Sequence, residues 1–132
     1  MFRLCAPVLL LVMLAACGGV TDPSQNKTET YSATIPVGKA GPVHTFNIPK
    51  TGEYLVKVVS MTPTISSNTY FYAAFGQPAS GSCAPIQANS LAVVGSTVLN
   101  GPIYNSGTYC VLLGDEGFFT VDETYTITVS HP

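Results

Sequence analysis

Hydrophobic and polar residues alternate with a period of two along much of this chain. The clearest example is 125–131, where Tyr125, Ile127 and Val129 fall on one face and threonine and serine fall on the other. Residues 53–61 alternate in the same way. Because successive side chains of a β-strand point to opposite faces, this period predicts strands with one buried face.

Turn-forming residues separate the alternating stretches. Glycine, proline, asparagine and serine recur between them, and no stretch shows the 3.6-residue period of a helix. The predicted strands are 31–35, 43–48, 53–61, 69–75, 83–87, 91–94, 97–103, 105–114 and 125–131. Seven to nine short strands with frequent turns predict an all-β fold, an antiparallel β-sandwich or jelly roll that forms one domain.

The strand 69–75 carries aromatic residues on both faces. Phe71 and Phe75 share one face, and Tyr70 and Tyr72 share the other. Two such tyrosines could form a flat platform on which a sugar or a peptide stacks. The alternative, which we favour, is that they fill the second face of a buried central strand. The chain has no tryptophan, which also argues against a carbohydrate platform.

The first residues have the pattern of an export signal. Arg3 is followed by a short apolar run over 6–14, which is too short for a membrane-spanning helix but fits a signal peptide. The run closes on Leu14-Ala15-Ala16-Cys17, which resembles the lipobox of bacterial lipoproteins. We therefore expect a signal peptide over 1–16, a polar tether over 17–30 and a domain over 31–132.

The lipobox resemblance implies how the chain would be anchored. Cleavage would follow Ala16, and Cys17 would carry a diacylglycerol and an acylated amine. Several acyl chains anchor a protein stably, whereas one holds it only marginally. Gly18 stands where an aspartate usually signals retention in the inner membrane, so the resemblance implies a lipid-anchored protein of the outer membrane.

The remaining cysteines suggest a disulfide. If Cys5 leaves with the signal and Cys17 carries lipid, Cys83 and Cys110 are left in an oxidising compartment, where two such cysteines most plausibly pair. The alternatives are two buried free thiols or a zinc site, and the zinc site lacks further ligands at a suitable spacing.

Charge excludes some partners and points to no reaction. Charged residues make up 9% of the chain and the formal net charge is −2, so no basic surface is available to neutralise nucleic-acid phosphates. His44 and His131 lie outside any metalloprotease motif, and there is no nucleophile-elbow pattern. The sequence therefore favours a protein that is not an enzyme, although a catalytic triad assembled only in space stays open.

The only cluster of acidic residues lies at the two ends of one predicted loop. Asp115, Glu116, Asp122 and Glu123 would come together if the strands that flank the loop are neighbours. Four oxygen-bearing side chains could hold a structural calcium ion, which would relieve their mutual repulsion. The alternative, which we favour, is an ordinary solvated loop.

Two stretches share the form Gly-x-Tyr-x-Val-x-apolar, 52–58 and 107–113, with Phe46-Asn47-Ile48-Pro49 before the first. Together with the Tyr-x-Ile-x-Val strand at the end, they resemble bacterial pre-peptidase C-terminal domains. The resemblance covers about 34–132. It implies a jelly-roll-like sandwich that serves as an accessory or binding module of secreted enzymes, but this chain carries no attached enzyme.

The expected function is that of a cell-envelope lipoprotein whose β-sandwich is a non-catalytic binding or accessory module. Its partners would be the membrane, through the lipid anchor, and a protein or carbohydrate ligand. The alternatives are a structural subunit of an envelope assembly and a small surface hydrolase. Apart from the calcium hypothesis, no cofactor is expected.

Overall fold

The alternating stretches form eight β-strands in a computed structural model that describes residues 23–132. The strands are β1 (Lys27–Ile35), β2 (His44–Ile48), β3 (Gly52–Thr62), β4 (Phe71–Ala79), β5 (Ser82–Ala92), β6 (Thr97–Ile103), β7 (Gly107–Gly114) and β8 (Glu123–His131). One turn of 3-10 helix, Pro23–Gln25, precedes β1. Over these described residues, no helix is long and apolar enough to cross a membrane.

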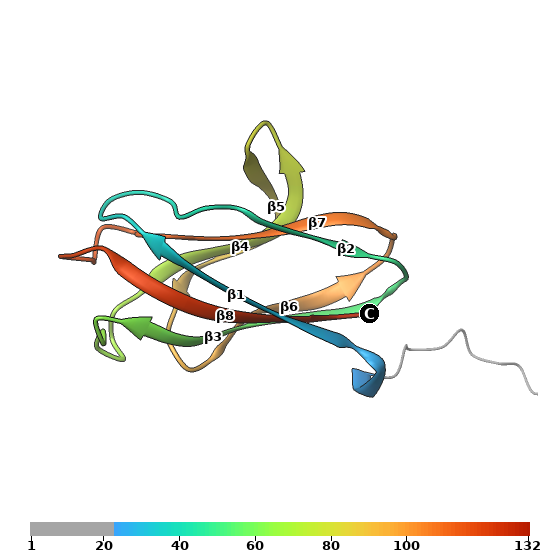
Figure 1. Cartoon of the computed structure of the whole chain (residues 1–132), viewed down its shortest axis with the longest axis horizontal. Helices are drawn as coiled ribbons and strands as arrows, with labels where there is room; N and C mark the ends of the chain where they lie inside the picture. The colour runs from blue at the N-terminus through green and yellow to red at the C-terminus, as the bar shows by residue number, and fades with distance from the viewer. Residues whose placement is uncertain (1–22) are drawn as a thin grey trace, which may run out of the picture.

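The strands form two four-stranded antiparallel sheets, ordered β1-β8-β3-β6 and β2-β7-β4-β5, which lie face to face (Figure 1). In this order the first strand pairs with the last, the second with the seventh, the third with the sixth and the fourth with the fifth. The chain is thus a long double ribbon, folded back at the β4–β5 hairpin and rolled into two layers. This is a jelly roll, and it confirms the predicted fold class.

The hairpin that closes the ribbon has a two-residue turn. Ser80 and Gly81 have φ values of 48° and 76°, and positive φ at both central positions matches the right-handed twist of the flanking strands. Further along β4, a Cβ atom on Gly76 would lie 1.8 Å from the carbonyl oxygen of Ala84. Only glycine allows this close approach, which accompanies a shift in register between Phe75 and Gly76.

The core lies between the sheets and follows from the alternation. The inward-facing side chains of β3 and β8 are buried, and they pack against the inward-facing side chains of β2, β4 and β7. Tyr125, Ile127 and Val129, which were predicted to share a buried face, are buried there, as are Phe46, Ile48 and Tyr109. Burial of these side chains is the main favourable contribution to folding.

A second, smaller cluster covers the outer face of the β2-β7-β4-β5 sheet. Cys83 and Cys110 form a disulfide, with their Cα atoms 5.8 Å apart, so the predicted pairing is confirmed. Leu112 is buried beside them, and Val43 and Tyr72 pack against the cluster. The disulfide ties β5 to β7 across the intervening strand β4.

The structure corrects several predicted boundaries, among them the start of β8, which lies at Glu123 and not at residue 125. Strand β1 begins at Lys27, not at residue 31, because Lys27 through Thr30 pair with the end of β8. The β-sandwich therefore already includes residues 27–30, which were predicted to precede it. Strand β4 continues to Ala79, and the predicted strands 83–87 and 91–94 are one strand, β5. The expected signal peptide, 1–16, lies outside the described residues.

Candidate functional site

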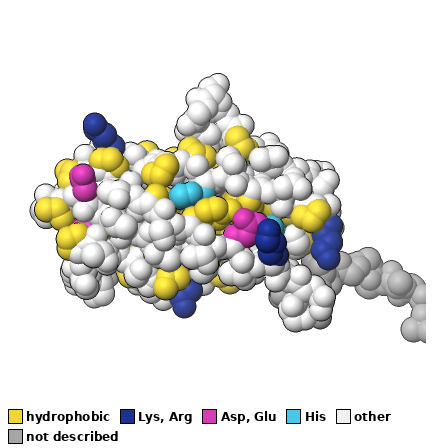
Figure 2. All heavy atoms as spheres, viewed as in Figure 1, with side chains coloured by type: hydrophobic (Ala, Val, Ile, Leu, Met, Phe, Trp, Pro, Cys, Tyr) yellow, Lys and Arg dark blue, Asp and Glu magenta, His cyan; other side chains and the backbone are white. Residues whose placement is uncertain are grey.

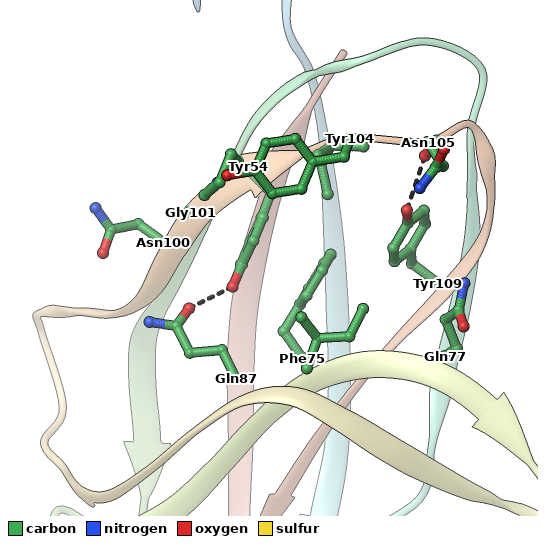
Figure 3. A pocket seen from close by; sticks show the side chains of 12 residues that line it. Tyr54, Phe75, Gln77, Gln87, Asn100, Gly101, Tyr104, Asn105 and Tyr109 are labelled. Atoms are coloured by element: carbon green, nitrogen blue, oxygen red, sulfur yellow. Dashed lines mark hydrogen bonds between the residues drawn. The ribbon is translucent and has the colours of Figure 1, made fainter.

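The two layers meet along two seams, one between edge strands β1 and β2 and the other between edge strands β5 and β6. The β5/β6 seam opens into a cleft of about 410 Å³, which we call the aromatic cleft (Figure 3). It lies toward the end of the sandwich where β1 begins and β8 ends. Its lining is Tyr54, Phe75, Gln77, Ile86, Gln87, Asn100, Gly101, Pro102, Ile103, Tyr104, Asn105 and Tyr109.

The floor of the aromatic cleft is a stack of three buried rings. The ring centroids of Tyr54 and Phe75 are 3.6 Å apart and those of Phe75 and Tyr109 are 5.3 Å apart, with nearly parallel planes. The Tyr54 hydroxyl donates to Gln87 Oε1, and the Tyr109 hydroxyl donates to the carbonyl oxygen of Asn105 at 2.7 Å (Figure 3). Burial raises the pKa of Tyr54 to about 12. The floor is therefore rigid and neutral, with both phenol groups hydrogen-bonded.

The rim of the aromatic cleft is polar and carries one free ring. Tyr104 is 77% exposed at the rim (Figure 3). The amide side chains of Gln77, Asn100 and Asn105 are exposed around it. Among the described residues that line the cleft, none carries a charge at neutral pH. The cleft thus combines a stacking surface with amides that can both donate and accept hydrogen bonds.

The opposite seam, between β1 and β2, is closed by side chains. His44 stacks on Tyr31 with ring centroids 4.7 Å apart, and its Nε2 is hydrogen-bonded to the Tyr125 hydroxyl at 2.7 Å. Burial lowers the pKa of His44, which favours the neutral ring. His44 is half-buried because it fills this seam.

His131 closes the same seam at the end of β8. It is 1% exposed, stacks on Phe46 and shares a hydrogen bond with Glu29 Oε1 at 3.1 Å. Glu29 also accepts from the Tyr31 hydroxyl at 2.6 Å and from Lys27 Nζ at 2.9 Å. These hydrogen bonds, that of Tyr31 first, lower the pKa of Glu29 to about 2. Glu29 is therefore ionised and paired.

The four carboxylates of the predicted calcium site do not converge. Asp115 Oδ1 accepts from the backbone amides of Gly117, Phe118 and Phe119, and its Oδ2 accepts from the amide of Gly38 at 2.7 Å. Burial alone would raise the pKa of Asp115, but these hydrogen bonds outweigh it and lower the pKa. Asp115 thus organises two loops rather than offering its oxygens to a metal ion.

The other three carboxylates point elsewhere. Asp122 accepts from the amide of Val37 at 3.0 Å, Glu116 is exposed, and Glu123 is buried. Across residues 23–132, no group of three or more histidine, cysteine, aspartate or glutamate side chains could hold a metal ion. The structure therefore does not bring the four carboxylates together: backbone amides of the loops occupy both aspartates, Glu116 is exposed, and Glu123 is buried in the sandwich.

Glu123 is the unusual member of this group. It is 3% exposed, its Oε2 is buried and has no hydrogen-bond partner, and burial raises its pKa. It begins β8 opposite Ile35 of β1 and borders a pocket of about 330 Å³ at the end of the sandwich farthest from the aromatic cleft. We call this the acid pocket.

The two predicted platform tyrosines have different surroundings. Tyr72 packs against the outer disulfide cluster, in keeping with the alternative that it fills the second face of a central strand. Tyr70 precedes β4 and lies edge-on to Phe118, with ring centroids 6.3 Å apart. A stacking surface is instead provided by Tyr104, at the other end of the sandwich.

The sequence patterns did not reveal the aromatic cleft or the acid pocket. They also did not reveal the hydrogen bond between Glu29 and His131. A signal for one of them was present, since His131 has the same parity in β8 as the inward residues Tyr125, Ile127 and Val129. The predicted lipidation site, Cys17, lies outside the described residues. No protein-family model and no curated protein sequence matches this chain.

Proposed function

We propose that this chain is a cell-envelope lipoprotein whose jelly roll is a non-catalytic binding module for a neutral saccharide. The aromatic cleft is the observation that carries this proposal. Its volume falls in the range of small-molecule sites, and it combines a preformed apolar floor with a few polar groups at the rim. The resemblance to accessory domains of secreted enzymes agrees with a role in binding rather than in chemistry.

The chemistry of the lining favours a neutral, hydroxyl-rich ligand. Amide side chains can donate to and accept from the hydroxyl groups of a sugar, and Tyr104 offers an exposed ring face. A charged ligand would find no oppositely charged side chain to pair with in this lining. Glycoside hydrolysis requires a pair of carboxyl groups, and the described lining has neither carboxylate nor histidine, which supports binding without turnover.

The edge strands beside the cleft argue against a peptide that binds by adding a strand. Pro85 lies in β5 and Pro102 lies in β6, the two edge strands of this seam. Proline cannot donate a backbone hydrogen bond, so each interrupts the row of amides that an added strand would pair with. A peptide would have to bind by its side chains alone, whereas a saccharide needs only the amides and the ring.

The test is a titration of the protein with neutral tetrasaccharides of N-acetylglucosamine, glucose and galactose, followed through the backbone amide signals. Tyr104→Ala should weaken binding about tenfold or more, since it removes the only exposed aromatic side chain of the lining and a loss of about 1.4 kcal/mol is tenfold in affinity. Leu91→Ala is the matched control. Leu91, on β5, is exposed as Tyr104 is, but it lies outside the cleft.

Two outcomes would contradict the saccharide proposal. One is the absence of any shift at Gln87, Asn100 or Tyr104 with every tetrasaccharide. The other is binding that Tyr104→Ala and Leu91→Ala weaken equally.

The anchor is tested separately. It rests on Leu14-Ala15-Ala16-Cys17 and is supported by the disulfide, which is typical of proteins outside the cytosol. Cys17→Ser should move the protein from the membrane fraction to the soluble fraction. Mass spectrometry that finds an unmodified Cys17 in the mature protein would rule out the anchor and leave the saccharide proposal standing.

A further inference from the structure

The end of the sandwich farthest from the aromatic cleft is formed by loops that join the strands. The loop 36–43 runs beside the end of β7, with the Gly41 amide donating to Leu113 O at 2.8 Å and the Asp115 amide donating to Lys39 O at 3.0 Å. The Asp115 side chain then fixes the loop 115–122 through three further backbone amides. The loop 115–122, which forms one wall of the acid pocket, is therefore held in place by hydrogen bonds.

Apolar side chains are exposed around the acid pocket. Val37, Tyr70, Phe118 and Val121 are each more than a third exposed, although they come from three separate loops. Figure 2 shows hydrophobic side chains gathered at this end, on the left of the view, beside an acidic group. Phe118 and Val121 line the pocket itself. An exposed group of apolar side chains such as this is typical of a protein-interaction site.

The charge of the far end is strongly acidic for so weakly charged a chain. Asp115, Glu116, Asp122 and Glu123 are four of the seven acidic residues in the sequence. The loops at this end carry one basic residue, Lys39. A positively charged partner would be attracted to this end rather than to the neutral aromatic cleft.

Glu123 gives this surface a specific point of recognition. Its carboxyl group is enclosed, one of its oxygens has no hydrogen-bond partner, and it borders the pocket below Phe118 and Phe119. A buried polar group without a hydrogen-bond partner is unfavourable. A ligand that supplies the missing hydrogen bond removes this cost, and its binding is favoured for that reason. Burial raises the pKa of this carboxyl group, and a cation in the pocket would favour the ionised form.

We propose that the acid pocket binds an arginine side chain presented by a partner protein. The guanidinium would donate to the Glu123 carboxylate, and its stem would lie against Phe118 and Val121. Arginine fits better than lysine, because its planar group pairs with a carboxylate through two hydrogen bonds and stacks on aromatic rings. Arginine and aromatic side chains also dominate the centres of protein interfaces.

The test uses the full-length lipidated protein in detergent, titrated with Nα-acetyl-arginine methylamide. The control probe is Nα-acetyl-citrulline methylamide, which has nearly the same shape and no charge. We expect the arginine probe to shift the amide signals of Thr69, Phe119 and Thr120 and to bind about tenfold or more tightly than the citrulline probe. Equal binding of the two probes, or no shift with either, would overturn the proposal.

Two variants sharpen the test. Glu123→Gln keeps the shape of the side chain and should weaken the arginine probe by about tenfold or more. Glu116→Gln removes the same charge from an exposed position of the preceding loop, 115–122, and should change the affinity by less than about twofold. Equal losses in both variants would mean that only the general acidity of the loops attracts the probe. If a variant fails to fold, the position of the shifts in wild-type protein decides: shifts of Thr69, Phe119 and Thr120 with the arginine probe support the acid pocket, and tighter binding of that probe without these shifts contradicts it.

Discussion

The two ends of the β1–β8 strand pair each place an ionisable side chain of β8 inside the sandwich. At one end, His131 meets Glu29, which also accepts hydrogen bonds from Tyr31 and Lys27. At the other end, Glu123 lies opposite Ile35 and its Oε2 has no partner. The same strand pair therefore carries a polar cluster whose side chains are hydrogen-bonded at one end and a carboxyl oxygen without a hydrogen-bond partner at the other.

This difference distinguishes side chains that stabilise the fold from a side chain that is available to bind a partner. A cluster whose hydrogen bonds are complete contributes to the folded state and needs nothing from outside the chain. A buried carboxyl group without a partner is unfavourable in the folded state and is retained only where something else, such as a bound ligand, favours it. We therefore interpret the Glu29 end as structural and the Glu123 end as a place for a partner.

The largest expected effects come from truncating buried rings at the two ends. Tyr109→Ala should lower the free energy of unfolding by about 3–5 kcal/mol, because it opens a cavity beside Phe75 and removes the hydrogen bond to Asn105. Phe119→Ala should cost less, because Phe119 borders the acid pocket and its loss lets water reach Glu123. Urea unfolding of both variants measures the difference, and equal losses would mean that the two ends are packed alike.

Reduction of the disulfide should have the next largest effect. Cys83 and Cys110 are 27 residues apart, and the chain-entropy estimate for a loop of this length is roughly 3–4 kcal/mol. The disulfide ties β5 to β7 beside the aromatic cleft and far from Glu123. Hydrogen exchange after reduction should therefore rise in β5 before it rises at the start of β8, and a uniform rise would contradict this local assignment.

Replacing Glu29 or Glu123 with glutamine should change the stability by a smaller amount. The two changes should have opposite signs. The pKa of Glu29 is about 2 in the folded protein, below its ordinary value of 4.5. Its contribution is therefore fully present above about pH 4.5 and is lost as the pH falls toward 2. Glu29→Gln should lower stability at pH 7 by about 1 kcal/mol, allowing for partial exposure, and this loss should shrink as the pH falls toward 2.

Glu123→Gln should act in the other direction. A raised pKa means that the folded state holds this proton more tightly than the unfolded chain, so ionised Glu123 opposes folding at neutral pH. The variant should melt at a slightly higher temperature than wild type at pH 7, and the difference should vanish as the pH falls to about 4. A lower melting temperature at pH 7 would indicate a stabilising contact of the carboxylate.

Strand alternation predicted the fold and much of the core, since it depends only on neighbours in sequence. The same parity also places Glu123 and His131 inside, but the charge of Glu123 favoured a solvated loop. The aromatic cleft was out of reach, because Gln87 and Asn100 meet only where two edge strands meet. Pro85 and Ser90 obscured the continuity of β5, which the β-bulges against β4 accommodate.

The most direct test of this account is a titration of the side-chain carboxyl signals of Glu29 and Glu123 by NMR in one sample of the wild-type protein. We expect Glu29 to titrate near pH 2 and Glu123 to titrate above its ordinary value of 4.5. Addition of the arginine probe should lower the pKa of Glu123 and leave that of Glu29 unchanged. Two carboxyl groups that both titrate near 4.5, with or without the probe, would contradict it.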